Sequence, residues 1–226
     1  MCVDEGLLKG SMLPFFHQAM EANMGIIVLN PNVNNFQLTD KDGNTSRVPI
    51  PYNETPEKHV LYVYDRIISR TTARNIVMLG YGNGGALAKS LLQLREDTIL
   101  SKLRCIALTD SRHTLNNDLN FGLMTADSQT TRDFLEKHTI NWIVSGLKQG
   151  SRDYVRERRL GCLCVSTVPV SSNPGLIHSV AADQIMGFFA KSCSDPELTA
   201  DKFWLEDIEK GETENQRSGS GDLKAN

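Results

Sequence analysis

The segment of this 226-residue chain that could best form a catalytic or binding site is rich in glycine. Residues 79–86 have the sequence Leu-Gly-Tyr-Gly-Asn-Gly-Gly-Ala and lie between an apolar run and an amphipathic run. Two kinds of site use glycine at such a strand-to-helix turn. In one, backbone amides bind a pyrophosphate; in the other, a nucleophile elbow exposes a serine hydroxyl. Residues elsewhere in the chain distinguish these two kinds of site.

The first alternative is a dinucleotide site, because Gly80, Gly82 and Gly85 fit the fingerprint G-x-G-x-x-G. That fingerprint normally follows the first strand of its domain, and here an apolar run at 25–29 precedes it. The acidic residue expected about 20 residues further on would have to be Asp110, which comes later than that. A dinucleotide-dependent oxidoreductase therefore stays open only as an alternative, and no cofactor is expected.

The second alternative is a nucleophile elbow, G-x-S-x-G. Gly80 and Gly84 match its outer glycines, and Gly82 stands in the position of the serine. Asp110 ends the next apolar run, and His178 lies in a later loop that contains proline and glycine. Nucleophile, acid and histidine follow one another in this order along the chain of α/β-hydrolases.

Glycine has no hydroxyl, so this elbow is not expected to act as a nucleophile. We interpret Gly82, Asp110 and His178 as vestigial positions, with no intact catalytic set. Asp110 is expected to cap the turn at 111–115, and His178 to be an ordinary loop histidine. A hydrolase with a displaced nucleophile, such as Ser111, is the remaining enzymatic alternative.

Other reactive residues favour structural roles. Cys162 and Cys164 occupy alternate positions of an apolar run, which favours buried thiols over a metal pair. No second Cys/His pair at ligand spacing accompanies them, so no metal site is expected. One basic cluster at helical spacing is the candidate contact for RNA or an acidic partner, and it comprises Arg152, Arg156, Arg158 and Arg159.

The elements that would position these residues alternate between strands and helices. Apolar runs predict strands at 25–29, 75–79, 103–108 and 161–168, and amphipathic patterns predict helices at 13–23, from 56, and at 86–94, 130–138 and 180–189. The polar stretch 31–55 is expected to be a long surface loop. This order predicts an α/β domain with a mostly parallel sheet and helices on both faces, over residues 1–208. Residues 209–226 are expected to be a disordered polar tail.

The overall composition excludes several classes of protein. A formal net charge of −3 gives no reason to expect a globally basic nucleic-acid binder or a membrane-surface protein. Five cysteines at irregular spacing suit a reducing compartment. The apolar runs are too short to span a bilayer, and the first residues lack the order of a signal peptide. We expect a location in the nucleus, the cytoplasm or both, and no membrane partner.

Several segments resemble the family-with-sequence-similarity-172 proteins, which are cotranscriptional regulators. The similar segments include 25–32 (Gly-Ile-Ile-Val-Leu-Asn-Pro-Asn), 55–65, the elbow, 106–113 (Ile-Ala-Leu-Thr-Asp-Ser-Arg-His), 141–142 and the His178 loop, covering most of 7–190 in order. That family shares its domain with an Argonaute-binding protein of fission-yeast heterochromatin silencing. The resemblance implies an α/β-hydrolase-like fold, and protein partners of the Argonaute, chromatin or splicing type. It also implies a role in gene silencing or alternative splicing, with RNA contacted directly or through a partner.

Two departures from that family bear on activity. The family elbow typically has the pattern small-His-Ser-aromatic-Gly-Gly, whereas this chain has Tyr81, Gly82 and Asn83 in the middle positions. Family members also carry an upstream strand and a glycine-bearing loop that would supply oxyanion-hole amides. This chain begins after that region, so we expect an N-terminally truncated domain. Together the departures imply a pseudoenzyme that acts as an interaction module.

Overall fold

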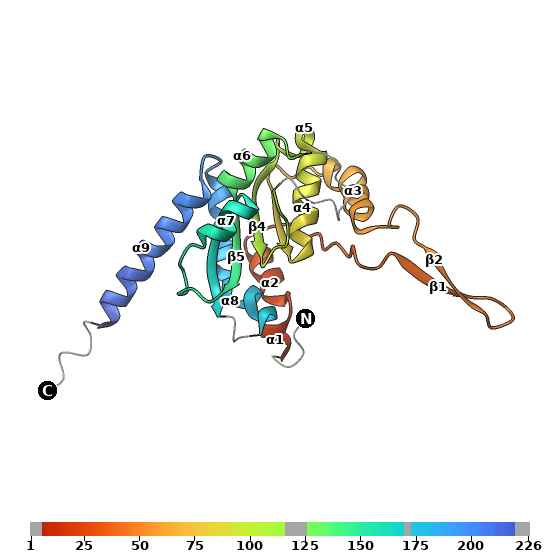
Figure 1. Ribbon diagram of the computed structural model, residues 1–226, viewed down its shortest axis with the longest axis horizontal. Coiled ribbons are helices and arrows are strands. Elements are labelled where there is room, and N and C mark those ends of the chain that lie inside the picture. Colours follow the sequence, from red (N-terminus) through yellow and green to blue (C-terminus); the bar gives the residue numbers. More distant parts are fainter. Residues whose placement is uncertain (1–5, 116–125, 170–172, 220–226) are drawn as a thin grey trace.

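A four-stranded parallel sheet forms the centre of the computed structural model, which describes residues 6–115, 126–169 and 173–219 (Figure 1). Its strands are β3 (Ile76–Tyr81), β4 (Leu103–Thr109), β5 (Thr139–Ser145) and β6 (Leu163–Pro169), and they lie side by side in chain order. Each neighbouring pair is parallel. The expected α/β class with a parallel sheet is confirmed.

Helices cover both faces of the sheet, as expected. Because the strand order follows the chain, right-handed crossovers place the connecting helices on one face. That face carries α3 (Pro56–Arg66), α4 (Asn83–Leu94), α5 (Glu96–Ile99), α6 (Gln129–His138) and α7 (Tyr154–Leu160). The other face carries α1 (Gly6–Gly10), α2 (Leu13–Glu21), α8 (Ile177–Ser194) and α9 (Ala200–Gly219). Short 3-10 turns occur at Ile68–Arg70 (η2) and Pro174–Leu176 (η4).

The core consists of two apolar clusters separated by the sheet. Successive residues of β4 alternate between them: Cys105 and Ala107 belong to the cluster with α8, and Ile106 and Leu108 to the cluster with α4. This alternation follows from the two-residue period of a strand. Both faces of β4 are therefore buried, which explains its almost continuous apolar sequence.

Strand β5 was not predicted from the sequence, although every one of its residues is buried. Its sequence, Thr-Ile-Asn-Trp-Ile-Val-Ser, is interrupted by polar residues and gives no continuous apolar run. The central Asn141 is tolerated because its side chain is bonded. Its Oδ1 accepts the Ser111 N–H at 3.2 Å, and its Nδ2 lies 3.9 Å from the Cys164 Sγ.

The prediction of a buried strand at 25–29 is wrong. Residues 24–30 have no regular structure, and the side chains of Ile26, Ile27 and Val28 are exposed. A run of β-branched residues becomes a strand only where a neighbouring strand supplies hydrogen bonds. In the described part of the chain, the sheet order begins at β3 and contains no strand that pairs with this segment.

The stretch 31–55, predicted to be a surface loop, contains an antiparallel hairpin. It consists of β1 (Asn35–Thr39) and β2 (Thr45–Pro49) and projects from the body of the molecule (Figure 1). Asp40 holds its turn, because one carboxylate oxygen accepts the N–H groups of Asp42 at 2.9 Å and Asn44 at 2.8 Å. The short alternation around Phe36 was the signal for a strand that the polar composition obscured.

The observed start of a helix agrees with the predicted start where the sequence contains a capping residue. Thr55 caps α3 as predicted, since its hydroxyl accepts the Lys58 N–H at 3.3 Å. Helix α9 continues through Gly219 and so extends into the stretch 209–226, for which a disordered polar tail is predicted. Glutamate, lysine, glutamine and arginine favour a helix once its first turns are packed, here through the buried Phe203. Residues 220–226 lie outside the described part. Among the described residues, no helix has the length and apolar character needed to cross a membrane.

Candidate functional site

The turn between β3 and α4 has the backbone geometry of a nucleophile elbow. Gly82 has φ 53° and ψ −114°, a strained combination that side chains rarely adopt. Its N–H donates to the Thr109 carbonyl at 3.0 Å, and its own carbonyl accepts the Arg112 N–H at 3.0 Å. A Cβ atom placed on Gly82 would meet nothing within 4 Å. The turn thus has space for a side chain at this position but carries none.

The neighbouring glycines are required by close packing rather than by ligand binding. A Cβ atom on Gly80 would lie 2.9 Å from the Gly84 carbonyl oxygen. A Cβ atom on Gly85 would lie 1.9 Å from the Ser111 hydroxyl. The first turn of α4 therefore approaches β3 at Gly80, and Ser111 after β4 at Gly85, too closely for a larger residue at either position. Gly84 differs, because a Cβ atom there would meet open space.

His178 lies beside this turn. The prediction of a loop histidine is wrong, because His178 lies in the first turn of α8. Its Nδ1 is 3.2 Å from the Thr109 hydroxyl oxygen, and its ring meets the Tyr81 ring edge-on at 4.7 Å. Burial lowers the pKa of His178 to about 4, because the charged imidazolium loses its hydration. The structure therefore brings this predicted histidine to the elbow, in its neutral form at physiological pH.

Asp110 follows β4 at the same edge of the sheet, but its carboxylate has a different partner. Its Oδ1 lies 3.4 Å from the Arg156 Nη1. Arg156 in turn lies 3.6 Å from the Asp153 carboxylate. The expected cap of the 111–115 turn is wrong, because among the described residues the Asp110 side chain contacts Arg156 instead. The backbone of Asp110 has a left-handed φ of 44°, and its N–H donates to the Trp142 carbonyl at 2.8 Å.

The predicted arginine cluster does not form a single surface. Arg152 binds both Glu157 carboxylate oxygens, at 3.0 and 2.9 Å, and Asp201 at 2.7 Å. Its guanidinium also lies over the rings of Tyr154 and Trp204, at 5.1 and 5.3 Å. Arg152 is therefore a structural contact between α7 and α9.

The other members of the cluster differ in exposure. Arg156 is held by Asp110 and Asp153, as described above. Arg158 and Arg159 are exposed in the last turn of α7, where cations interact favourably with the helix dipole. Only part of the predicted RNA or partner contact is thus available to a ligand.

A serine–histidine hydrogen bond that the sequence did not reveal lies directly beneath the elbow. The Ser111 hydroxyl is 2.7 Å from the His113 Nδ1, and the His113 Nε2 is 2.8 Å from the Leu160 carbonyl oxygen. Such a pair is one requirement for an activated serine. Here, however, Ser111 is 7% exposed and His113 is fully buried. Because the hydroxyl also packs against Gly85, the pair links β4 to α7 rather than facing solvent.

A buried ion pair supports the same region from within. Lys89 lies one turn beyond Gly85 on α4, and its Nζ is 2.8 Å from the Asp127 carboxylate, with side chains 1% and 2% exposed. The same Nζ donates to the Thr114 carbonyl. Lys89 thus holds residues on both sides of the segment 116–125, which lies outside the described part.

Cys105, Cys162 and Cys164 are buried, as predicted for the last two, although Cys162 precedes β6 instead of lying within it. The pKa of the Cys162 thiol is raised well above its usual value by the neighbouring Cys164 and by burial. Burial raises the pKa of Cys105 to about 12. These thiols are therefore protonated and poorly reactive. Among the residues that the structure describes, no three His, Cys, Asp or Glu side chains could hold one metal ion.

The comparisons with known proteins all indicate the same family. The sequence model of the Arb2 domain matches residues 1–149, which include the elbow and Asp110 but not His178. The chain is similar to "Cotranscriptional regulator ARB2A homolog" of Xenopus tropicalis, with 26% identity over 64% of this chain and 43% of that protein. The protein of the same name from Dictyostelium discoideum is 32% identical over 66% of this chain and 43% of its own length.

A mouse relative, "Cotranscriptional regulator ARB2A" of Mus musculus, is 25% identical over 64% of this chain and 44% of its own length. The chain therefore spans less than half the length of these curated relatives. No solved structure matches it.

Proposed function

The chain belongs to the Arb2 domain family, and on this basis we propose that it is a regulatory interaction domain with an α/β-hydrolase-like fold and no hydrolase activity. Its relatives are named as cotranscriptional regulators, not as enzymes. The proposed role is in cotranscriptional regulation, through silencing of chromatin linked to Argonaute and small RNAs or through alternative splicing. The proposed location is the nucleus, the cytoplasm or both.

The observation that carries the proposal is the geometry around Gly82. The backbone has the turn that presents a nucleophile, yet the residue has no side chain to present. The two other positions of a hydrolase site are also engaged elsewhere. The His178 Nδ1 faces the Thr109 hydroxyl, and the Asp110 carboxylate faces Arg156. A serine hydrolase requires a hydroxyl, a base that takes its proton, and an acid that orients the base. At this edge of the described sheet, Gly82 supplies no hydroxyl, and the Asp110 carboxylate faces Arg156 instead of His178.

The enzymatic alternatives have less support. An oxidoreductase would direct the backbone amides of the glycine turn at a pyrophosphate, whereas the Gly82 amide donates to Thr109. The third glycine of the fingerprint, Gly85, is explained by packing, because a side chain there would collide with Ser111. A hydrolase using Ser111 would need its hydroxyl to reach a substrate, and that hydroxyl is enclosed.

The absence of hydrolysis is tested with the purified chain and a series of activated esters, together with His178→Ala. We expect both proteins to match the buffer rate, and a fluorophosphonate probe to leave both unlabelled. Turnover that is lost in His178→Ala would contradict the proposal, because it would require a working base at the elbow.

The partner class is tested separately by precipitation from nuclear extract with and without ribonuclease. We expect Argonaute, chromatin or splicing proteins to be enriched over a bead control in both conditions. Enrichment of none of these classes would contradict the regulatory role without affecting the conclusion on hydrolysis.

A further inference from the structure

A second surface, distant in sequence from α7, combines exposed arginines with exposed aromatic rings. Positions 58, 62, 66, 70 and 74 hold Lys, Tyr, Arg, Arg and Arg, at a constant spacing of four residues. The first three lie on α3, and Arg70 ends the 3-10 turn that follows it. All five residues are exposed. Residues four apart lie on the same side of a helix, so Lys58, Tyr62 and Arg66 form one stripe.

Most of the positive charge on these five residues is not neutralised. Lys58 has a partner, since its Nζ lies 3.4 Å from the Glu54 carboxylate. The nearby Asp65 is occupied by Arg95, which binds its two carboxylate oxygens at 2.8 and 2.7 Å. Within the described residues, Arg66, Arg70 and Arg74 make no ion pair. Three guanidinium groups are therefore available to an anionic ligand.

The aromatic part of the surface is a stacked pair of tyrosines. The rings of Tyr52 and Tyr62 are nearly parallel, with centroids 5.1 Å apart and an interplanar angle of 14°. Tyr52 is 64% exposed and Tyr62 40%. The Glu54 carboxylate accepts the Tyr52 N–H at 3.2 Å, which helps to hold the ring in place. Such a pair presents a flat aromatic face to solvent, one helical turn before Arg66.

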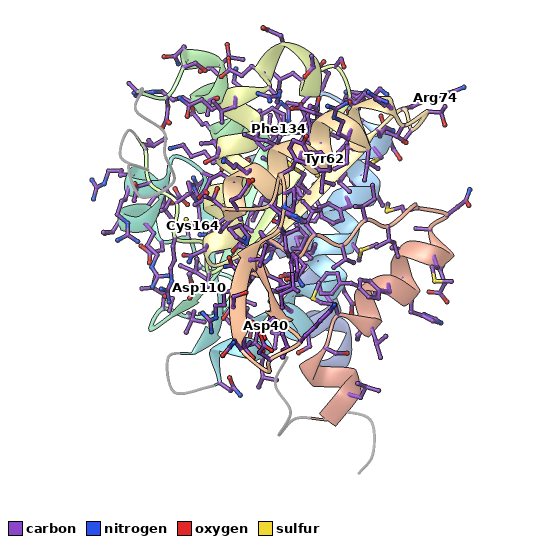
Figure 2. All side chains as sticks on the ribbon, turned by 90° about the vertical axis from the view of Figure 1, so that its right-hand side faces the viewer. Asp40, Tyr62, Arg74, Asp110, Phe134 and Cys164 are labelled. Atoms are coloured by element: carbon purple, nitrogen blue, oxygen red, sulfur yellow. The ribbon has the colours of Figure 1, made fainter. Side chains whose placement is uncertain are left out.

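Strand β4 holds the arginine-bearing connection in a defined position. The Lys102 Nζ donates to the Thr71 carbonyl at 2.7 Å, and the Arg104 Nε donates to the Asn75 side-chain oxygen at 2.7 Å. These bonds hold the chain at Thr71 and Asn75, the two ends of the short segment that contains Arg74. In Figure 2, Tyr62 lies on α3 at the side that faces the viewer, and Arg74 extends outward beyond the end of that helix.

We propose that this aromatic–basic surface, formed by Tyr52, Lys58, Tyr62, Arg66, Arg70 and Arg74, binds single-stranded nucleic acid. The arginines match the regular negative charge of a phosphate backbone. The exposed tyrosine face matches an unpaired base, which stacks on aromatic rings whatever its identity. An acidic protein segment would use the same charges but leave the aromatic face unused. The surface shares no residue with the elbow, so the inference goes beyond the proposed function and stands independently of it.

The test is fluorescence anisotropy of the full chain with labelled oligouridine and oligothymidine at increasing salt. We expect saturable binding of both, because phosphate contacts and stacking do not depend on the 2′-hydroxyl. With three phosphate contacts, the logarithm of the association constant should fall with that of the salt concentration at a slope of about −2. A duplex of the same length should bind more weakly, since its bases are not available for stacking.

Three variants assign the binding to this surface. Arg66→Gln/Arg70→Gln/Arg74→Gln should remove most of the affinity and most of the salt dependence. Tyr52→Ala should weaken single-strand binding by about 5- to 150-fold, while Tyr52→Phe should bind as the wild type does. The matched control, Lys137→Gln/Lys148→Gln, removes two exposed lysines that lie outside this surface and should leave binding unchanged. Circular dichroism verifies that each variant is folded.

Four results would overturn the inference. They are the absence of saturable binding by the wild-type chain, equal loss of binding in the lysine control, unchanged binding in Tyr52→Ala, and displacement of the oligonucleotide by polyglutamate at an equal concentration of charge. The last result would assign the surface to an acidic protein partner instead. None of them affects the elbow, which ester turnover tests by itself.

Discussion

The guanidinium of Arg156 lies 3.4 Å from the carboxylate of Asp110, so the acid that follows β4 faces α7 and not the histidine at the elbow. Both side chains are one-third exposed, and an ion pair in such a setting contributes little to stability, about 0–1 kcal/mol. Its importance is orientation. A histidine that acts as a base requires a partner on its second ring nitrogen, and Asp110 is directed elsewhere.

Restoring the serine should therefore not restore hydrolysis. Gly82→Ser has space for its side chain but must adopt φ 53° with ψ −114°, which should cost about 1–3 kcal/mol of stability. We expect no ester turnover, because the acid that would orient His178 is paired with Arg156.

Gly82→Ala is the control for Gly82→Ser, since it imposes the same backbone cost without the hydroxyl. Thermal unfolding and ester turnover of both variants check the prediction. Robust hydrolysis by Gly82→Ser that disappears in Gly82→Ser/His178→Ala would show that the remaining groups suffice.

Gly85→Ala should be more destabilising than Gly84→Ala. The new methyl group at 85 would overlap the Ser111 hydroxyl at 1.9 Å, whereas at 84 it would enter open space. Overpacking of this kind costs about 1–3 kcal/mol. Gly84→Ala should change stability little or raise it, because alanine favours a helix. Urea unfolding of the two variants gives the comparison, and equal stabilities would contradict the close approach of α4 to β4.

Acidification should destabilise the fold partly through His178. Its pKa of about 4 in the folded state lies below the ordinary 6.5, so the unfolded chain binds more protons between these pH values. Stability is therefore complete above pH 6.5 and falls as the pH decreases toward 4, by up to about 3 kcal/mol from this group.

The pH dependence is checked by urea unfolding of the wild type and His178→Gln from neutral pH to pH 4. The variant should show a shallower loss, although the lowered pKa values of the partly buried His59 and His138 leave part of it in place. His17→Gln is the matched control, because the His17 side chain is 75% exposed. Parallel curves for wild type and His178→Gln would show that His178 is not neutral in the folded protein.

Lys89→Met should be among the most destabilising single changes in the chain. It leaves the Asp127 carboxylate buried without its cation, a situation that costs about 3–5 kcal/mol. Lys89→Met/Asp127→Leu should recover part of that loss. Lys58→Met, which breaks an exposed pair with Glu54, should cost at most about 1 kcal/mol. Similar losses for the two single variants in urea unfolding would contradict the burial of the Lys89 pair.

The elements that were predicted correctly are those that neighbouring residues in the sequence determine. Helix α3 was recognised because Thr55 and Pro56 form a cap that needs no distant contact. The segment 25–29 has the residues of a strand, but its pairing depends on a neighbour that composition does not reveal. Strand β5 was missed for the converse reason, since the Asn141 side chain inside it contacts Ser111 and Cys164, which are remote in sequence.

The same limit applies to the candidate site. Chain order suggested a nucleophile, acid and histidine set in Gly82, Asp110 and His178, and the structure brings His178 to Thr109 and Tyr81 beside the glycine turn. Chain order gave no indication that Thr109 and Arg156 would take the hydrogen bonds expected within a catalytic set. The aromatic–basic surface also escaped notice, because its members become neighbours only when Tyr52 stacks on Tyr62.

The order of the strands has a consequence for how the chain folds. Because β3, β4, β5 and β6 are adjacent in the sheet as they are in the chain, each can join the edge formed by its predecessor as synthesis proceeds. The helices of one face are added along the way, but α8 and α9 come last and cover the other face. A nascent or truncated chain that ends before Ile177 would leave Ala107, Trp142 and Val165 uncovered, and such an intermediate should aggregate or require a chaperone.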